Sequence, residues 1–511
     1  MRLVQATALP LVVILTACGS GNDVTTALSC SDLTDWSSPG IAFASVEEAF
    51  PEEGPAHCKV AGTIDGTIRF ELLLPMADDW NERFVMGGGG GFVGSVENSA
   101  LAPMSGGNAL ERGFATVGTD TGHTGTAIDA SWALDNEEAE VNFGHRAIHR
   151  TTEVAKEIIV DYYAHPIEYS YFIGCSRGGG QAMIEAQRYP DDYDGIVAMA
   201  PAYSWPRLGT GFLQIEQRVY PNPADLSEPV ITDENRALLE REILSRCDAS
   251  DGVEDGLLTD PRTCDFDPAD LACSGAADFS CLTANQLEAV RAIYSGPEID
   301  GQQVFAGFPF GGENDPGGWD TWITGGGDRF GPGIPNLHWA FGTEMFKYLI
   351  FDDPDFDYSR YDFANWESDI AAADRLLSAV ETDLSGLRDS GGKLLFWHGW
   401  SDPALTALGT IDYYEAVEAR DPQVRDYSRL FLAPGVLHCG GGPGPDRVDY
   451  LSAIGGWVED GQAPDRLLAQ KIDEEGQVTV SRPLCSFPQI AVYNGSGDTS
   501  SAASFDCEVP E

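Results

Sequence analysis

The chain has 511 residues and carries 30 Lys and Arg against 81 Asp and Glu, which gives a formal net charge of −51. Hydrophobic residues make up 43% and aromatic residues 10%, a composition that excludes intrinsic disorder. The excess of carboxylates argues against binding to nucleic acid or to an anionic lipid surface, where Lys and Arg must neutralise phosphates. The length exceeds the roughly 250–300 residues at which single cores stop growing, so we expect a main domain with an insertion or a second domain.

The N-terminus has the features of an export signal. Arg2 supplies a positive charge, and an apolar run over residues 9–15 leads to Leu15-Thr16-Ala17-Cys18. The run is shorter than the ~20 residues of a membrane span, so we interpret residues 1–17 as a cleaved signal peptide. The end of the run resembles the lipobox of bacterial lipoproteins, in which the cysteine is acylated, and residues 18–29 would then form a tether. We expect a protein exported from a bacterial cell, either anchored at Cys18 in the periplasm or outer membrane or simply secreted, whose only membrane contact would be that anchor.

Short apolar runs bounded by Gly and Asp predict buried strands at residues 68–74, 83–86, 115–117, 169–173, 195–200, 393–397 and 429–432. Helical patterns, such as those at residues 147–163 and 179–188, lie between several of these strands. This alternation predicts an α/β fold with a mostly parallel sheet covered on both faces.

The alternation breaks between residues 205 and 385, where four cysteines, a Gly-rich run and clustered aromatic residues occur. We interpret residues 205–385 as a lid domain inserted between two parts of a core, residues 30–204 and 386–511.

A nucleophilic serine is predicted at Ser176. The sequence Gly174-Cys175-Ser176-Arg177-Gly178 matches G-x-S-x-G, and it stands between a predicted strand and a predicted helix, as a nucleophile elbow requires. The alternative is an ordinary tight turn. A serine also needs a base that is held by a carboxylate, and in α/β-hydrolases these follow in the order Ser, Asp or Glu, His.

Asp402 and His438 are the candidates for the carboxylate and the base. Asp402 follows the strand predicted at residues 393–397, and His438 lies on a loop after the strand predicted at residues 429–432. Asp446 and Asp449, which lie near the histidine in sequence, are alternative carboxylates. His398 is expected to pack, or to form a hydrogen bond behind the site.

The acyl-transfer reaction also needs hydrogen-bond donors for the developing oxyanion. The backbone N–H of Arg177, the residue after the nucleophile, is one candidate. The second is expected from the five glycines at residues 87–91, which follow an early strand and let the backbone approach a substrate closely. A phosphate-binding loop is the alternative, but the G-K-[ST] ending that it needs is absent.

Without Cys18, ten of the 11 cysteines remain, the even number expected of an exported disulfide protein. Local spacing predicts the pairs Cys30–Cys58, Cys247–Cys264, Cys273–Cys281 and Cys485–Cys507. The last two, Cys175 and Cys439, adjoin the predicted nucleophile and base, so a disulfide between them would hold these two residues together. The alternatives are that both cysteines pair elsewhere, or that thiols bind a metal, for which no C-x-x-C spacing exists.

These motifs together resemble the tannase/feruloyl esterase family of α/β-hydrolases. The matching segments are Gly-Cys-Ser-Arg-Gly-Gly at 174–179, His-Gly-Trp-Ser-Asp at 398–402 and Pro-Gly-Val-Leu-His-Cys-Gly-Gly-Gly-Pro-Gly at 434–444. The resemblance implies hydrolysis of aromatic carboxylic esters (galloyl, feruloyl or related hydroxybenzoates) through an acyl-enzyme on Ser176. It also selects Gly91 as the second oxyanion donor.

The resemblance further implies a structural calcium ion in the lid. Asp248, Asp251 and Asp255 would supply carboxylates, and Val253 and Leu257 would supply carbonyl oxygens, within a loop whose glycines permit a tight wrap. An acidic turn without an ion is the alternative. No organic cofactor is expected.

The family also includes hydrolases of terephthalate monoesters, which would need a cationic group in the lid to meet the free carboxylate of the substrate. Arg329 is the only arginine in the corresponding region of the lid. Trp322 is the aromatic residue that we expect to stack on an acyl ring, with a place in the core as its alternative. Two other interpretations are a non-catalytic lipoprotein that binds ligands on a hydrolase fold, and a serine peptidase of the same fold.

Overall fold

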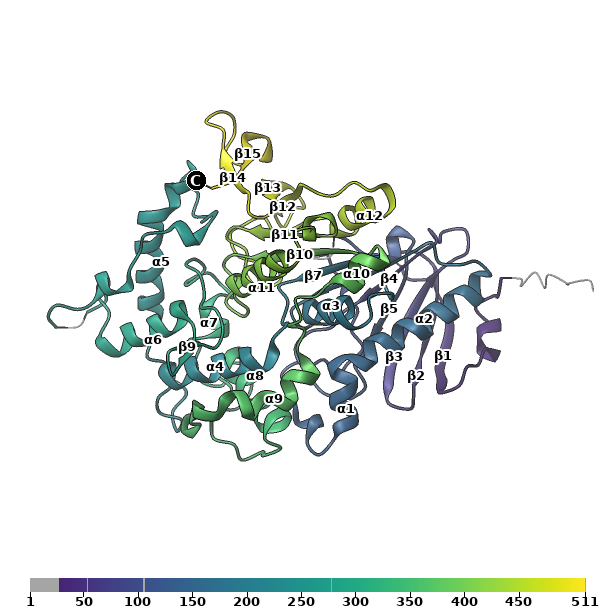
Figure 1. The fold of residues 1–511 in the computed structure, drawn as a ribbon, viewed down its shortest axis with the longest axis horizontal. Helices are drawn as coiled ribbons and strands as arrows, with labels where there is room; N and C mark the ends of the chain where they lie inside the picture. The colour runs from purple at the N-terminus through teal and green to yellow at the C-terminus, as the bar shows by residue number, and fades with distance from the viewer. Residues whose placement is uncertain (1–26, 53, 104–105, 277, 511) are drawn as a thin grey trace, which may run out of the picture.

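The protein is described by a computed structural model for residues 27–52, 54–103, 106–276 and 278–510. Its central sheet has the strand order β1 (Ile41–Ala49), β2 (His57–Ile64), β3 (Ile68–Pro75), β5 (Ala115–Thr119), β4 (Arg83–Gly87), β6 (Tyr169–Cys175), β7 (Gly195–Met199), β10 (Lys393–Gly399) and β11 (Ser428–Ala433). The pairs from β5 to β11 are parallel, and those from β1 to β5 are antiparallel (Figure 1). The mostly parallel α/β fold expected from the sequence is confirmed.

Each of the seven predicted strands is present, with ends that differ from the prediction by at most two residues. Strands β5 and β7 are buried along their whole length, which explains why they read as continuous apolar runs. Strands β1 and β2 were not predicted, because neither is a continuous apolar run. In β1, partly buried side chains alternate with exposed ones, and in β2 buried side chains alternate with partly buried ones. They extend the sheet at its N-terminal edge.

Two hydrophobic clusters lie on opposite faces of the sheet, because alternate residues of a strand point to opposite faces. On β6, Phe172 joins a cluster with α2 (Ala147–Tyr163), α3 (Arg177–Arg188) and α11 (Ala407–Arg420). Its neighbours Tyr171 and Ile173 join a cluster with α12 (Tyr450–Asp460). The short helix α1 (Glu137–Val141) precedes α2. The sheet is therefore covered by helices on both faces.

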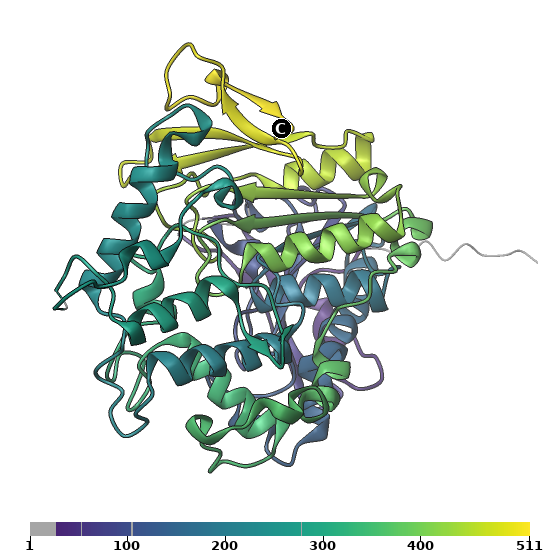
Figure 2. The same ribbon diagram turned by 60° about the vertical axis from the view of Figure 1, so that its left-hand side comes forward.

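Between β7 and β10 the chain leaves the sheet and forms most of the remaining helices. These are α4 (Trp205–Val219), α5 (Asp233–Cys247), α6 (Ala284–Ser295), α7 (Trp319–Trp322), α8 (Leu337–Met345), α9 (Trp366–Leu377) and α10 (Ser385–Ser390), with a small hairpin of β8 (Glu298–Ile299) and β9 (Gln302–Gln303). Figures 1 and 2 show most of this excursion, in teal to green, at one side of the sheet, whereas α10 lies beside α3 on the sheet. It has a hydrophobic cluster of its own, centred on α5 and α6, and it contains the residues 205–385 that we predicted as the lid.

The C-terminal segment adds two hairpins that the sequence did not predict. They consist of β12 (Arg466–Ile472) with β13 (Val478–Cys485) and of β14 (Ile490–Tyr493) with β15 (Phe505–Glu508). Val253 of the lid packs into a small cluster with Cys485, Ala491 and Phe505, so these hairpins support one end of the lid.

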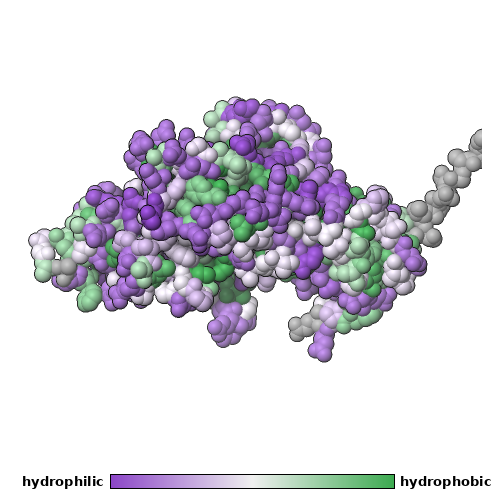
Figure 3. Space-filling view, turned by 90° about the horizontal axis from the view of Figure 1, so that it is seen from below, coloured by the Kyte–Doolittle hydropathy of each residue, from purple (hydrophilic) through white to green (hydrophobic). Residues whose placement is uncertain are grey.

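All five predicted disulfides are present: Cys30–Cys58, Cys175–Cys439, Cys247–Cys264, Cys273–Cys281 and Cys485–Cys507. Such bonds form and persist in oxidising compartments, and they agree with the expectation of an exported protein. Within the described residues, no helix is both long and apolar enough to cross a bilayer. The face seen in Figure 3 is largely hydrophilic, with hydrophobic residues in scattered patches. The predicted signal peptide and Cys18 lie outside the described residues.

Candidate active site

Ser176 occupies a strained turn between β6 and α3. Its backbone has a positive φ of 63°, which is rare for a residue other than glycine, with ψ of −123°. The turn is so tight that a Cβ atom on Gly174 would lie 2.4 Å from the backbone oxygen of Gly178. A larger residue at position 174 would therefore force the elbow open. The turn raises Ser176 at the carboxyl end of a central strand, where it is partly exposed.

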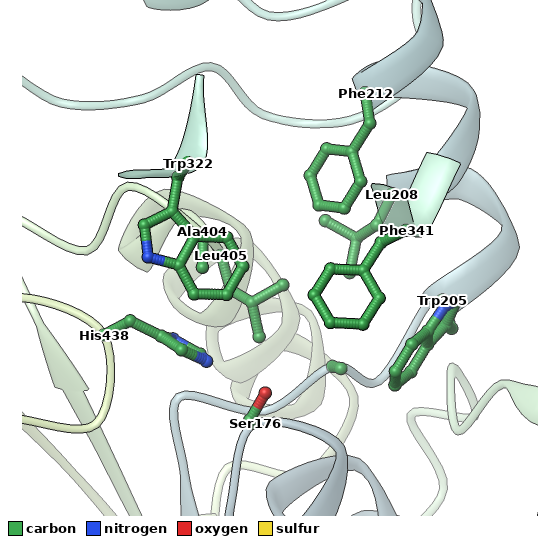
Figure 4. A pocket seen from close by; sticks show the side chains of 10 residues that line it. Ser176, Trp205, Leu208, Phe212, Trp322, Phe341, Ala404, Leu405 and His438 are labelled. Atoms are coloured by element: carbon green, nitrogen blue, oxygen red, sulfur yellow. The ribbon is translucent and has the colours of Figure 1, made fainter. Parts of the chain in front are cut away.

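Asp402 and His438 are brought together at the same edge of the sheet, on the loops that follow β10 and β11. The Nδ1 atom of His438 lies 2.8 Å from Oδ2 of Asp402. Figure 4 shows the imidazole of His438 extending towards the hydroxyl of Ser176. The three residues predicted as a triad from chain order thus lie at one edge of the sheet, in the arrangement that a nucleophile, its base and an orienting carboxylate require.

The two alternative carboxylates lie in other interactions. Asp446 accepts a hydrogen bond from the backbone N–H of Gly441 and lies 3.4 Å from Lys471. Asp449 caps helix α12 and forms an ion pair with Arg112. The geometry therefore favours Asp402 as the partner of His438.

Asp402 is held ionised although its side chain is fully buried. Its Oδ1 accepts hydrogen bonds from the backbone N–H groups of Ala404 and Leu405, at 2.8 and 3.0 Å. Burial alone would raise the pKa of this carboxyl, but the charges and hydrogen bonds of His438 and His398 outweigh burial and hold the pKa below its ordinary value. An ionised Asp402 accepts from Nδ1–H of His438, which leaves the Nε2 lone pair facing outward to take a proton.

His398 lies behind the carboxylate rather than in the cavity. Its Nε2 is 3.2 Å from Oδ2 of Asp402 and 2.8 Å from the carbonyl oxygen of Leu405. Its Nδ1 lies 2.8 Å from the hydroxyl of Thr410. This buried residue fixes the turn that carries Asp402, which is the supporting position expected from the sequence.

The Cys175–Cys439 disulfide joins the residue before the nucleophile to the residue after the base. The two Cα atoms are 5.9 Å apart, although the cysteines are separated by 264 positions in the chain. The bond ties the end of β6 directly to the loop that carries His438. It fixes the relative positions of Ser176 and His438, on which nucleophilic catalysis depends.

The glycine loop at residues 87–91 packs against the start of α3. A Cβ atom on Gly88 would lie 2.7 Å from the Cα of Gly178, so only glycine permits this approach. The amides of Gly88, Gly89 and Gly90 donate to Ile173, Gln181 and Glu97, respectively.

Gly91 follows these three residues with φ of 52°, and the hydrogen bonds of the described residues include none from its amide. The amide of Arg177, at the first position of α3, is likewise without an intrachain acceptor there. These are the two donors that we expect at an oxyanion hole. Gln181 and Glu97, which orient the loop, carry no motif that would have revealed them.

The side chain of Arg177 has a structural position that the sequence did not predict. It is fully buried and donates hydrogen bonds to the carbonyl oxygens of Phe143, Gly144 and Leu377. Burial, with a smaller contribution from the charge of Arg188, lowers the pKa of Arg177 to about 9. The guanidinium therefore points away from the cavity and holds the nucleophile helix against the lid helix α9.

A cavity opens above Ser176 and His438. The core supplies Ser176, Ala202, Ala404, Leu405 and His438, and the lid supplies Trp205, Leu208, Phe212, Trp322 and Phe341. Figure 4 shows Trp322 and Phe341 above His438 and Ser176, with Trp205 to one side and Phe212 farther from them. The ring of Trp322 lies edge-on to that of His438, with centroids 5.0 Å apart. Trp322 is therefore part of the cavity wall.

None of the ten residues lining the cavity is Lys or Arg. Arg329, the lid arginine noted in the sequence, donates at 2.8 Å to the carboxylate of Asp320 and at 2.6 Å to its carbonyl oxygen. Its charge is neutralised outside the cavity.

The acidic loop at residues 248–257 presents an oxygen-rich set of groups of the kind that calcium prefers. Burial raises the pKa values of Asp248 and Asp251, and the nearby charge of Asp255 raises both further. Asp255 is thus close enough to repel each of the other two carboxylates. Asp255 also forms an ion pair at 2.5 Å with Arg482 of β13. Carboxylate and carbonyl oxygens are the ligands that calcium accepts, so the residue types fit this ion. The carboxylate oxygens of the three aspartates do not all lie within 4.8 Å of one another, which is wider than the spacing of ligands around one ion.

The comparisons with known proteins agree with this geometry. The family model described as tannase and feruloyl esterase matches residues 54–508. A mono(2-hydroxyethyl) terephthalate hydrolase from Piscinibacter sakaiensis is 35% identical, over 89% of this chain and 85% of that protein. A probable feruloyl esterase from Arthroderma benhamiae is 36% identical, over 87% of this chain and 83% of that protein. The crystal structure of feruloyl esterase B from Aspergillus oryzae has a TM-score of 0.81 at 25% identity, over 94% of this chain and 99% of that chain. The protein is a carboxylic ester hydrolase that belongs to the tannase and feruloyl esterase family of α/β-hydrolases.

Proposed function

We propose that this hydrolase cleaves esters whose aromatic acyl group carries no charge, such as hydroxycinnamoyl and hydroxybenzoyl esters, through an acyl-enzyme on Ser176. One observation carries the proposal: the hydroxyl of Ser176 and the imidazole of His438 line a cavity whose opposite wall is formed by four aromatic rings. An aromatic acyl group placed there would stack on these rings while its carbonyl carbon stays within reach of Ser176.

In the first half of the reaction, Nε2 of His438 takes the proton of the Ser176 hydroxyl as Oγ attacks the ester carbonyl. Asp402 stabilises the imidazolium that forms. The amides of Gly91 and Arg177 donate to the developing oxyanion. His438 then gives its proton to the departing alcohol, and a water molecule activated by the same imidazole releases the acid from Ser176.

The charge of the cavity favours neutral over anionic acyl groups. The relative from Piscinibacter sakaiensis is named for a terephthalate monoester, whose second carboxylate is ionised at neutral pH. Here the cavity lining contains no Lys or Arg, and Arg329 is paired with Asp320. A free carboxylate buried among four aromatic rings would lack a cationic partner, which is costly. We therefore expect a terephthalate monoester to be a poorer substrate than a ferulate or gallate ester.

The test is turnover of methyl ferulate, methyl p-coumarate, methyl gallate and a terephthalate monoester by the purified protein. Wild type should hydrolyse at least one of the three neutral-ring esters, and Ser176→Ala should lose this activity and its labelling by a fluorophosphonate probe. Ser390→Ala, which changes an exposed serine on α10, is the matched control and should keep both. Faster hydrolysis of the terephthalate monoester than of the other three would overturn the proposed substrate class.

The loop at residues 248–257 is proposed as a structural calcium site. Asp248, Asp251 and Asp255 would supply carboxylate oxygens, and Val253 and Leu257 carbonyl oxygens. An ion there would neutralise mutually repelling carboxylates at the point where the lid meets the C-terminal hairpins. Added Ca²⁺ should raise the melting temperature of EDTA-treated wild type but not of Asp248→Asn. An equal rise in both proteins would place the ion elsewhere.

A lipid anchor at Cys18 is proposed from the sequence alone. Expression of the full chain in a bacterial host with a radiolabelled fatty acid should label wild type and place it in the membrane fraction. Cys18→Ser should be unlabelled. Wild type that is unlabelled and soluble would indicate plain secretion instead.

A further inference from the structure

Three side chains that could hold a metal ion meet at the far end of the nucleophile helix. They are His149 on α2, Glu185 on the last turn of α3, and Asp192 on the loop before β7. One ligand atom from each residue lies within 4.8 Å of the other two, and Nδ1 of His149 is 2.7 Å from Oδ2 of Asp192. Among the residues that the structure describes, no other group of His, Cys, Asp and Glu converges in this way.

Glu185 is the unusual member of the group. Its side chain is fully buried, and neither carboxylate oxygen has a hydrogen-bond partner among the described residues. An ionised carboxylate in this state is strongly disfavoured, and the negative charge of Asp192 beside it adds to the cost. The site therefore calls for a positive species between the two carboxylates, either a proton or a cation.

The nearby basic side chains are directed elsewhere. The ammonium of Lys156 donates to the main-chain oxygen of Asp192, and its own pKa is lowered by burial. Arg188 donates to the carbonyl oxygens of Arg375 and Ser378. Neither hydrogen-bonds to the carboxylate of Glu185.

The imidazole of His149 is oriented by two further contacts. It stacks on the ring of Tyr189, with centroids 3.9 Å apart and planes within 7°. Its Nε2 lies 3.6 Å from the carboxylate of Glu153, on the side away from Asp192. The stack and this contact hold Nδ1 towards the buried carboxylate of Glu185 and the partly exposed carboxylate of Asp192.

We propose that His149, Glu185 and Asp192 bind one divalent cation of the kind that accepts mixed nitrogen and oxygen ligands, with Zn²⁺ the best match. One imidazole nitrogen with two carboxylate oxygens is a ligand set that Zn²⁺ accepts, and it leaves a fourth position open. Glu185 gains the partner that it lacks.

The role of this cation is structural. Glu185 lies nine positions after Ser176, or roughly 13 Å along the helix axis, so the ion is remote from the reacting ester. It joins α2, α3 and the loop leading to β7. The site shares no residue with the cavity or with the acidic loop at residues 248–257.

The test uses the full chain freed of metal with EDTA and then titrated with Zn²⁺ alone, followed by calorimetry and by melting temperature. Wild type should bind one Zn²⁺ with a melting temperature raised by several degrees, because the ion binds the folded state. Glu185→Gln and His149→Gln should each weaken binding by about tenfold or more, since each removes one of three ligands. His165→Gln, which changes an exposed histidine, and Asp248→Asn, in the acidic loop, are the matched controls and should bind as wild type does.

Two results would overturn the proposal. The first is Zn²⁺ binding by His149→Gln as tight as that of wild type, which would place the ion at another site. The second is the absence of Zn²⁺ binding by wild type together with a higher melting temperature of Glu185→Gln in EDTA. That result would show that a proton shared with Asp192 satisfies Glu185. Because His149→Gln alters a partly exposed residue, the test does not depend on the folding of the Glu185 variant.

Discussion

Removal of the Cys175–Cys439 disulfide should cost more stability than removal of any other disulfide in the chain. In the chain-entropy description, a crosslink stabilises a protein by restricting its unfolded state, and the effect grows with the logarithm of the loop that it closes. The separation of 264 positions corresponds to about 5.5 kcal/mol, whereas the separation of 8 for Cys273–Cys281 corresponds to about 2.5 kcal/mol. The expected difference between the two bonds is about 3 kcal/mol.

The assay is equilibrium urea unfolding of two double variants, Cys175→Ala/Cys439→Ala and Cys273→Ala/Cys281→Ala, beside wild type. The second variant is the matched control, because it also removes one disulfide but lies in the lid away from the cavity. The first should lose about 3 kcal/mol more of the free energy of unfolding than the second. It should also lose kcat, since Cys439 adjoins His438, while the control keeps wild-type kcat.

Equal losses of stability in the two double variants would refute the loop-length reasoning. Unchanged kcat in Cys175→Ala/Cys439→Ala would refute the idea that the bond positions the base. The two readouts are independent, so either part of the argument can fail alone.

Three further predictions concern the site and its surroundings. Asp402→Asn should lower kcat by a factor on the order of 10³–10⁴ with little change in KM, because the amide no longer holds His438 in the tautomer that accepts the serine proton. Steady-state kinetics on methyl ferulate measure this change. A loss of kcat below tenfold would contradict the prediction. Trp322→Ala should lower kcat/KM for methyl ferulate by about tenfold through lost ring stacking, but it should leave kcat/KM for p-nitrophenyl acetate unchanged. An equal loss of kcat/KM on both esters would instead indicate that Trp322 is purely structural. Burial raises the pKa of Glu313 from 4.5 to about 7, so its contribution to stability is full below pH 4.5 and is lost as the pH rises through 7. Between pH 5 and pH 8 wild type should therefore lose roughly 2–3 kcal/mol of unfolding free energy relative to Glu313→Gln. Urea unfolding of both proteins at both pH values measures this difference. An equal change of unfolding free energy with pH in the two proteins would show that the Glu313 carboxyl is not the cause.

The sequence predicted the parallel part of the sheet well because those strands are buried on both faces. Strands such as β7 consist of uninterrupted apolar residues, and this signal needs no knowledge of their neighbours. Strand β1 contains Ser45, Glu47 and Glu48 and lies at the edge of the sheet as described, paired with β2, so its sequence looks like that of a polar surface segment. The C-terminal hairpins β12–β13 and β14–β15 are similarly exposed on one side. Their formation depends on pairing partners that a local pattern does not reveal.

The triad was predictable for a different reason, because chain order and the strand-loop setting are imposed by the fold itself. The residues that hold it in place were not. Gln181 and Glu97 bind amides of the glycine loop, and Arg177 ties α3 to carbonyl oxygens far away in the chain. Each of these contacts joins segments whose proximity exists only after folding, so no spacing in the sequence marks them.

The buried polar groups divide into two kinds by how their charge is satisfied. Asp402 is buried with four polar contacts, two from backbone amides and two from imidazoles, and its pKa falls below the ordinary value even though burial opposes this. Glu185 is equally buried, but its carboxylate oxygens have no hydrogen-bond partner in the part of the chain that the structure describes, and its pKa rises. The same low-dielectric surroundings therefore favour ionisation where donors converge and penalise it where none do. On this reasoning, Asp402 can orient His438 without a further ligand, because its oxygens already accept hydrogen bonds. Glu185, whose oxygens accept none among the described residues, is the carboxylate at which we expect a cation to bind.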